Sequence, residues 1–287
     1  LEPFECKNIL NDILTRLTSI KMTEVLEIPK RPVRKFLGED FKVTSWEGLK
    51  PFFDNLLERK IDSIADLRNW FHDRSELESV IGEDLAWRYI NMTCYTENED
   101  YRNSYQDFIE NIQPQIAPVS DKLNKKAAGS SFLNDLANGE GYDLMIRSLK
   151  KDIEIFRDEN VPLFTQISTE AQKYQQISGA MTVEVNSKEL TLQQASVFLM
   201  STDRSLREEV YHKITNRRLQ DHETLDSLFS NLIYLRHKVS VNAGFKNFRD
   251  YMFKALGRFD YTPQDCFNFH EAIQHEVVPI LDEFSKE

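Results

Sequence analysis

The sequence has 287 residues and a mass of 33.7 kDa, with 40% hydrophobic and 29% charged residues, proportions that exclude a disordered chain. Its formal net charge of −11 argues against a nucleic-acid partner, because phosphate binding relies on Lys and Arg displacing counterions. Nine Gly and nine Pro are too few for the turns of a sandwich or barrel, so we expect an all-α fold. The length exceeds that of most single cores and favours a multi-helix array in two lobes.

The cysteines and apolar segments bear on cellular location. Cys6, Cys94 and Cys266 lie too far apart for a CxxC metal clip or a disulfide framework, and we expect all three in the core. The sequence has no run of about 18 or more apolar residues, and its start lacks the order of a signal peptide. We therefore expect a cytoplasmic protein without a membrane partner, and the initial Leu1 suggests a trimmed start.

Apolar residues at helical spacing fill the first third of the chain. One such stripe covers residues 9–20. Thr44 and Glu47 form a T-x-x-E capping box before the next helix, Ser63 is expected to begin another, and Ser75 a further one. The stripe behind the first capping box comprises Leu49, Phe52, Phe53, Leu56 and Leu57.

Prolines and glycines divide the middle of the chain. Pro114 and Pro118 are predicted to bend or break the helix over 99–125, since each removes an amide donor. Residues 129–131 are expected to form a loop, and residues 160–162 to join two further helices.

One segment alternates in hydrophobicity instead of following the helical period. The alternation begins at Met181 and is followed by turn residues at 186–189, which predicts one small β-hairpin near 181–192. We place a domain boundary here. Residues 1–178 would form an N-terminal helical lobe, and residues 179–287 the hairpin and the start of a second helical lobe.

After the hairpin the pattern is helical again. Thr191 and Gln194 are expected to cap the next helix, and Gly244 to end a later one. Thr262 is expected to cap the final helix, with Pro263 in its first turn and Asp265 placed favourably for the helix dipole.

This final helix carries HEAIQH, residues 270–275, which differs by one residue of spacing from the zinc-protease signature HExxH. Histidines four residues apart are about 40° apart around a helix and reach one ion, whereas His270 and His275 are five apart, or about 140°. A π-bulge could realign them, but nothing else in the sequence calls for one. We predict no metal site here.

The same helix has an apolar stripe that we expect to be its buried face, and His275 points away from it. The stripe comprises Cys266, Phe269, Ile273, Val277, Ile280 and Phe284. The helix is expected to run through Pro279 to Glu287 without a stop signal, which suggests a chain that ends within a domain.

The other chemistry-bearing residues do not form a site by their spacing. The histidines His72, His212, His222 and His237 are expected at the surface. The acidic run at 97–100 lacks the central glycine of a calcium loop and is expected to be a solvated turn. The sequence contains no GxSxG, Walker-type or GxGxxG motif. We therefore predict no catalytic and no metal-binding residue in this chain.

Four stretches of the sequence resemble the oligoendopeptidase F family, thimet oligopeptidase-like zinc metallopeptidases. They are WFHDRSELESVIGEDLAWRYINMTC (70–94), IQPQIAPVSDKLNKK (112–126), ISGAMTVEVNSKELTLQQASVFLMSTDRSLREEVYHKI (177–214) and FKNFRDYMFKALGRFDYTPQDC (245–266). The likeness runs in order over most of residues 40–287.

The resemblance implies an all-α, two-lobed, zinc-dependent metalloendopeptidase that hydrolyses short unfolded peptides in a deep channel. In that family the zinc ligands come from an HExxH helix and a later glutamate, and no position here matches them. The resemblance therefore places the Zn²⁺ ligands C-terminal to Glu287. We expect this chain to be the N-terminal half of the enzyme and inactive alone.

Two residues between the last helices are candidates for substrate binding. Arg258 or Tyr261 could face a peptide, or Arg258 could instead pair with Asp260 and fix the turn. At the level of function, the alternative is a non-catalytic helical protein that binds peptides without cutting them.

Overall fold

A computed structural model of the chain describes residues 33–137 and 141–286. The chain separates into two units, Leu1–Glu39 and Asp40–Glu287, and the second holds every helix and strand discussed below. The stripe predicted over residues 9–20 and Cys6 lie outside the described residues.

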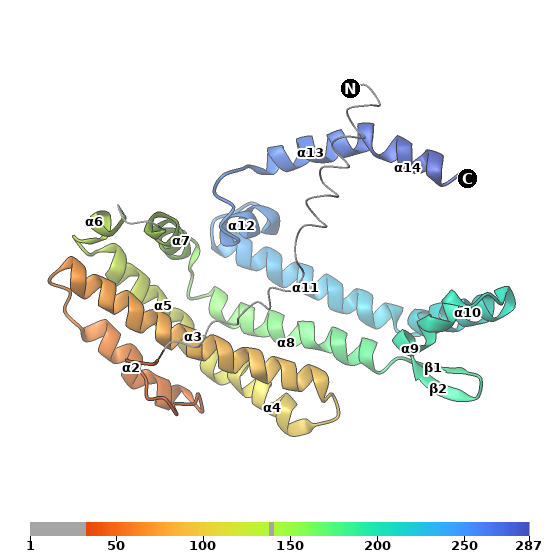
Figure 1. Cartoon of the computed structure of the whole chain (residues 1–287), viewed down its shortest axis with the longest axis horizontal. Coiled ribbons are helices and arrows are strands. Elements are labelled where there is room, and N and C mark those ends of the chain that lie inside the picture. The colour runs from red at the N-terminus through yellow and green to blue at the C-terminus, as the bar shows by residue number, and fades with distance from the viewer. Residues whose placement is uncertain (1–32, 138–140, 287) are drawn as a thin grey trace, which may run out of the picture. The chain divides into compact units, whose positions relative to one another are not determined.

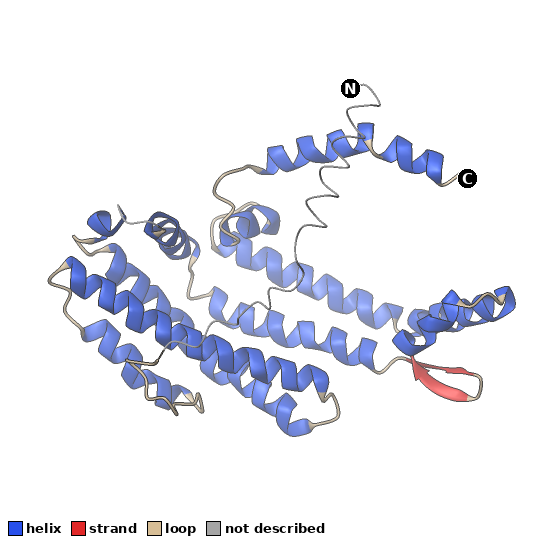
Figure 2. Ribbon diagram, in the orientation of Figure 1, coloured by secondary structure: helices blue, strands red, loops and turns tan. Residues whose placement is uncertain are grey.

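Helices make up most of the second unit (Figures 1 and 2). They are α2 (Trp46–Glu58), α3 (Ile64–Cys94), α4 (Glu99–Asp107), the π turn η1 (Phe108–Ile112), α5 (Gln113–Ala128), α6 (Leu133–Ala137), α7 (Tyr142–Ile155), α8 (Asn160–Gly179), α9 (Leu192–Ser196), the 3-10 turn η2 (Val197–Met200), α10 (Arg204–Gln220), α11 (His222–Asn242), α12 (Phe248–Ala255), α13 (Pro263–Glu276) and α14 (Val278–Phe284). Two short strands, β1 (Thr182–Val185) and β2 (Lys188–Thr191), lie between α8 and α9. The predicted all-α fold with one small hairpin is confirmed.

Helices α2 and α3 pack against each other through their apolar stripes. Phe53 and Leu56 of α2 are buried, as are Leu67, Trp70 and Leu77 of α3. The indole nitrogen of Trp70 donates a hydrogen bond to the carbonyl of Leu56 at 2.8 Å. The indole of Trp70, the largest side chain of this core, is therefore held both by packing and by its hydrogen bond to Leu56.

Two of the predicted helix starts are wrong. Helix α2 is capped by Ser45, whose hydroxyl accepts from the Gly48 amide, and not by Thr44. Helix α3 is continuous, so Ser75 lies in its interior, while Ser63 caps it as predicted. A capping motif marks a helix start only where the preceding residues leave the helix, and local sequence does not decide that.

The junction of α4 and α5 is a single π turn, η1. Pro114 lies in the first turn of α5, directly after η1, so the helix departs from α-helical geometry beside this proline, as predicted. Pro118 lies inside α5, which continues to Ala128, so of the predicted bend or break the break does not occur there. The predicted loop after Ala128 is present. Residues 160–162, predicted to join two helices, instead form the first turn of α8, and the connection from α7 lies at residues 156–159.

Helices α8 and α11 lie side by side (Figure 1) and share one hydrophobic cluster. The buried members are Ile155, Leu163, Leu235, Val239, Ala243 and Tyr251. Within this region the buried Asn160 amide nitrogen donates to the carbonyl of Val239 at 3.0 Å, and its oxygen accepts from Asn242 at 2.8 Å. The boundary predicted after residue 178 falls in the last turn of α8. Helix α8 precedes this boundary and helix α11 follows it, so the cluster joins helices of both predicted lobes. The division into two lobes stays a prediction.

Left-handed backbone occurs where the sequence predicts turns. Asn186 and Ser187, with φ of 54° and 59°, form the two-residue turn of the antiparallel hairpin. Gly244, with φ of 88°, follows the end of α11.

The hairpin shares a hydrophobic core with α9 and α10. The buried members of this core are Val183, Val185, Ala195, Val210 and Ile214. Thr191 and Gln194 form the predicted capping box of α9.

The predicted single final helix is two helices. Thr262 caps α13 together with Asp265, as predicted. The α-helix is interrupted at Val277, and α14 follows with Pro279 in its first turn, because a proline cannot donate the amide that a continuous helix requires. The predicted buried face is also wrong. Phe269 is 63% exposed and Phe284 69% exposed, and neither helix has a buried residue.

Other expectations about exposure have mixed outcomes. Cys94 is exposed and Cys266 is half-buried, so neither thiol lies in the core that we expected for it. The histidines predicted at the surface, His72, His212, His222 and His237, are all exposed. Within residues 33–137 and 141–286, none of the helices has the length and apolarity that crossing a bilayer requires.

Candidate functional site

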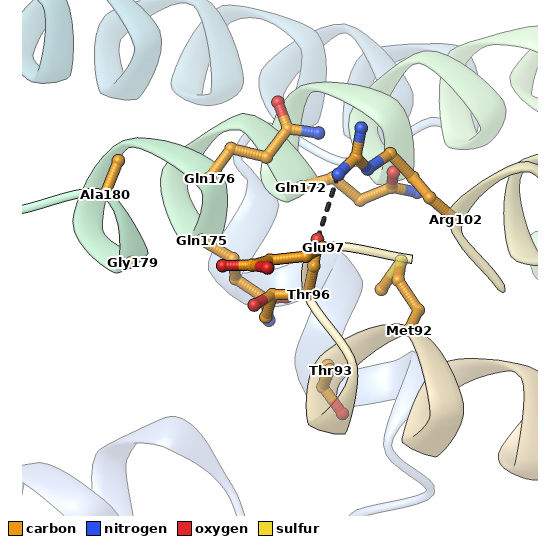
Figure 3. Close-up of a pocket in the computed structure, with 10 residues that line it drawn as sticks. All are labelled: Met92, Thr93, Thr96, Glu97, Arg102, Gln172, Gln175, Gln176, Gly179 and Ala180. Carbon is orange, nitrogen blue, oxygen red and sulfur yellow. Dashed lines mark hydrogen bonds between the residues drawn. The ribbon is translucent and has the colours of Figure 1, made fainter. Parts of the chain in front are cut away.

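A pocket of about 640 Å³ lies where the end of α3, the following loop and α4 meet α8 (Figure 3). Its lining residues are Met92, Thr93, Thr96, Glu97, Arg102, Gln172, Gln175, Gln176, Gly179 and Ala180. Only Glu97 and Arg102 among them carry charge, so the wall consists mainly of amide, hydroxyl and apolar groups.

The loop on one side of the pocket is held by hydrogen bonds at both of its ends. The Tyr95 amide closes the last turn of α3 on the carbonyl of Asn91 at 3.0 Å. Asn98 caps α4 by accepting from the amides of Asp100 and Tyr101. Between them, the Arg102 guanidinium donates to the carbonyl of Thr96 at 2.9 Å, the bond drawn in Figure 3. The acidic run at 97–100 is exposed, as predicted, but only Glu97 lies in a turn, since Asn98 caps α4 and Glu99 and Asp100 form its first turn.

The opposite wall is a row of glutamines on α8. Gln172, Gln175 and Gln176 are three and four residues apart and therefore share one helix face. Gln175 is positioned by α3, since its amide nitrogen donates to the Tyr89 hydroxyl at 3.1 Å. The buried amide nitrogen of Gln172 has no acceptor among the described residues. A buried donor without a partner is unfavourable, so this wall has unused hydrogen-bonding capacity.

The Tyr89 phenol that accepts from Gln175 lies next to a second tyrosine, Tyr105. The rings of Tyr89 and Tyr105 are 5.7 Å apart. Burial raises the pKa of the Tyr105 phenol, and the neighbouring Tyr89 raises it further. Tyr105 is therefore neutral at physiological pH, and its contribution here is packing.

This arrangement can bind but has no set of groups for covalent chemistry. The lining residues include no Ser, Cys, His or Lys, and their two hydroxyls, those of Thr93 and Thr96, have no histidine or lysine in the lining to activate them. Glutamine side chains carry both a donor and an acceptor, the same pair that a peptide group offers. The pocket therefore suits a polar ligand containing amide groups.

The candidate Arg258 lies over two aromatic rings in the turn between α12 and α13. Its guanidinium carbon is 5.1 Å from the centroid of Phe253 and 6.0 Å from that of Tyr261. The rings of Phe253 and Tyr261 meet edge to face at 5.3 Å. Both candidates are exposed, and neither lines the pocket.

The alternative ion pair for this turn, Arg258 with Asp260, is not the one observed. Asp260 accepts from Arg147 of α7 at 3.0 Å, and the Arg147 guanidinium carbon lies 4.5 Å from the centroid of Phe259. The ion pair between Arg147 and Asp260 thus connects the turn to α7. Arg258 instead stacks on the rings of Phe253 and Tyr261. Sequence spacing favours neighbours such as Asp260 and does not reveal a partner 113 residues away.

The two histidines of HEAIQH lie on a regular stretch of α13 and are both exposed. Because the helix is α-helical over residues 263–276, the π-bulge that could align them is not formed. Within residues 33–137 and 141–286, no three His, Cys, Asp or Glu side chains are grouped closely enough to hold a metal ion.

The glutamine wall is the feature that sequence reasoning missed. Its signal is present in AQKYQQISG, residues 171–179, where three glutamines recur at helical spacing. Glutamine on an exposed helix face is common, so the spacing alone does not indicate a pocket.

Two family models match the chain. Residues 36–156 match the Peptidase M3 N-terminal domain, and residues 197–287 match Peptidase family M3. The chain belongs to peptidase family M3. Together the two segments span most of the length of the described structure and include α2 and α3 in the first match and α13 and α14 in the second.

Solved structures share this M3 peptidase fold. A structure provisionally named oligoendopeptidase F matches with a TM-score of 0.80 and 19% identity, over 88% of this chain and 45% of its own. Another, from Bacillus anthracis str. Ames, matches with a TM-score of 0.79 and 21% identity, over 88% and 46%. PZ peptidase A with an inhibitor matches with a TM-score of 0.78 and 20% identity, over 86% and 44%. The M3 chain thus spans just under half the length of these structures. No curated protein matches it.

Proposed function

We propose that this M3 chain is the N-terminal portion of a zinc-dependent metalloendopeptidase that hydrolyses short unfolded peptides. The observation that carries the proposal is the order of the two family matches, an N-terminal domain followed by a peptidase segment. Since the chain spans under half of the matched structures, the activity would belong to the complete gene product.

The described residues do not fit a zinc site. A catalytic zinc needs three protein ligands that converge on one point, and His270 and His275 project about 140° apart from one helix. We therefore expect the zinc ligands C-terminal to Glu287, and residues 1–287 to be inactive alone. No catalytic step is assigned to a residue of this chain.

The chain would contribute binding. The Gln172, Gln175 and Gln176 amides line a pocket large enough for several side chains, and they can pair with the N–H and C=O groups of an extended peptide. The unpaired donor of Gln172 supports this role, since a peptide carbonyl would satisfy it after a side-chain rotation.

Hydrolysis of a quenched fluorescent peptide by the complete gene product tests the proposed activity. We expect cleavage that a metal chelator abolishes and added zinc restores. Cleavage that survives the chelator would exclude the metallopeptidase. Peptide binding without any cleavage would favour the alternative, a non-catalytic peptide-binding protein.

Substitutions on α8 test the pocket. In the complete gene product, Gln176→Ala and Gln172→Ala should each raise KM for peptides about two- to tenfold with kcat unchanged, the effect of one lost hydrogen bond. Gln166→Ala is the matched control, because Gln166 lies on the same helix but outside the pocket. Equal KM values for all three variants would remove the pocket from the proposal.

Two further expectations belong to this proposal. Arg258 and Tyr261 stay candidates for substrate contact, supported by their exposure in a turn that α7 holds in place. A cytoplasmic location is supported by the unpaired thiols of Cys94 and Cys266, since an oxidising compartment favours disulfides.

A further inference from the structure

Helices α13 and α14 expose an unusual amount of apolar surface. Eight apolar side chains on them are between 36% and 69% exposed: Phe267, Phe269, Ile273, Val277, Val278, Ile280, Leu281 and Phe284. Neither helix has a buried residue. In Figure 1 they are the last two helices, joined to α12 by a loop. Folded monomers rarely leave a contiguous apolar patch of this kind uncovered.

Five of these residues recur at helical spacing on both sides of the junction at Val277, and we call them the C-terminal stripe. Its members, Phe269, Ile273, Val277, Ile280 and Phe284, follow one another in steps of three or four residues. The polar residues Asn268, Glu271, His275 and Asp282 fall on the opposite side of a helical wheel. Phe267 and Val278 fall on that polar side, so the separation holds for the five stripe residues and not for every apolar residue of the two helices. The pattern is that of a helix pair with one face meant for burial.

We infer that the C-terminal stripe packs against the part of the peptidase M3 fold that the matched structures contain beyond the segment this chain covers. This inference rests on the proposed function, because it takes the chain to be one portion of a larger peptidase. The M3 family match includes both helices, and the structures that share the fold are about twice as long. The occupant would present an apolar face of its own.

Charge disfavours a second copy of this chain as the occupant. Each copy carries a formal net charge of −11, so pairing two of them brings like charges together. The polar side of α13 and α14 adds Glu271 and Asp282 to that repulsion. A second copy is therefore the outcome that would contradict the inference.

Hydrogen–deuterium exchange tests the inference directly. The amides of α13 and α14 should exchange at least about tenfold more slowly in the complete gene product than in the 287-residue chain, since packing suppresses local opening. The amides of α10, which lie outside the stripe, should exchange at the same rate in both. Equal rates for α13 and α14 in the two proteins would overturn the inference.

Matched variants test whether burial of the C-terminal stripe causes the slow amide exchange of α13 and α14. Ile280→Asp in the complete gene product should lower the melting temperature and restore fast exchange in α14. Leu219→Asp on α10 should do neither, although the two residues are similarly exposed in this chain, at 51% and 58%. If Ile280→Asp does not fold, the exchange comparison of the unmodified proteins still decides.

Two other outcomes have distinct meanings. Concentration-dependent protection of the stripe in the 287-residue chain, with a dimer seen by sedimentation, would assign the stripe to a second copy and overturn the inference. Peptide cleavage by a complete gene product whose α13 and α14 stay unprotected would sink this inference alone. Protection without cleavage would sink the proposed function alone.

Discussion

Helices α2 and α3 and helices α13 and α14 carry apolar stripes of similar spacing, but the two stripes are buried to very different extents. In the first region Phe53 is 1% exposed and Trp70 is fully buried, and a hydrogen bond joins the helices. In the second region Phe269 is 63% exposed. The comparison shows that periodicity specifies which face of a helix is apolar, while burial depends on whether a partner element is present.

The largest effect is expected in the buried region. Trp70→Ala should lower the free energy of unfolding by about 3–5 kcal/mol, because it opens a large cavity and leaves the Leu56 carbonyl without its indole donor. Urea unfolding measures the loss. Trp87→Ala is the control on the same helix, since Trp87 is 56% exposed and should cost far less. Equal losses for the two variants would contradict the distinction.

The next effect concerns the end of α2. The Lys126 ammonium donates to the carbonyls of Leu57 at 2.6 Å and Arg59 at 2.5 Å, groups that the helix itself leaves unpaired. Lys126→Met should therefore lower the free energy of unfolding by about 1–3 kcal/mol. Lys122→Met, at an exposed position of the same helix, should change it little. Thermal unfolding of both variants side by side provides the check.

A smaller effect should appear at alkaline pH. Burial raises the pKa of the Tyr251 phenol, with Asp152 adding to the shift. The unfolded chain then loses its phenolic proton at lower pH than the fold does, so the stability from this group is complete below about pH 10 and is lost as the pH rises through the folded pKa. Tyr251→Phe should reduce the decline, and Tyr261→Phe, at an exposed site, should not. An unchanged decline in Tyr251→Phe would show that other groups cause it.

The smallest effect is expected in the exposed region. Phe269→Ala in the 287-residue chain should change the free energy of unfolding by less than about 0.5 kcal/mol, because the ring is 63% exposed. In the complete gene product the same substitution should cost more, if the C-terminal stripe is covered there. A cost above about 2 kcal/mol in the 287-residue chain would show that α13 is already packed.

Much of this fold could be predicted from local chemistry. Thr191, Thr262 and Ser63 cap helices as expected because a hydroxyl beside unpaired amides is sufficient for a cap. The turn at Asn186 and Ser187 follows from the alternation on either side of it. The errors at Ser75 and Pro118 concern residues inside continuous helices, where a local start or break signal is overridden, whereas the break in the final helix has a local cause in Pro279.

The candidate site was less accessible to sequence reasoning. The pocket combines residues 92–102 with residues 172–180, and only the fold brings them together. Arg147 and Asp260 show the same limit, because the pair is 113 residues apart in sequence. The placement of His270 and His275 five residues apart on one helix could be predicted, because the capping signal at Thr262 is local.

The central claim is that this M3 chain belongs to a zinc peptidase but does not itself hold the metal. Metal analysis of the dialysed 287-residue chain and of the complete gene product tests it most directly. The account predicts no firmly held zinc in the first and one zinc ion per chain in the second. A firmly held zinc ion in the 287-residue chain would contradict it.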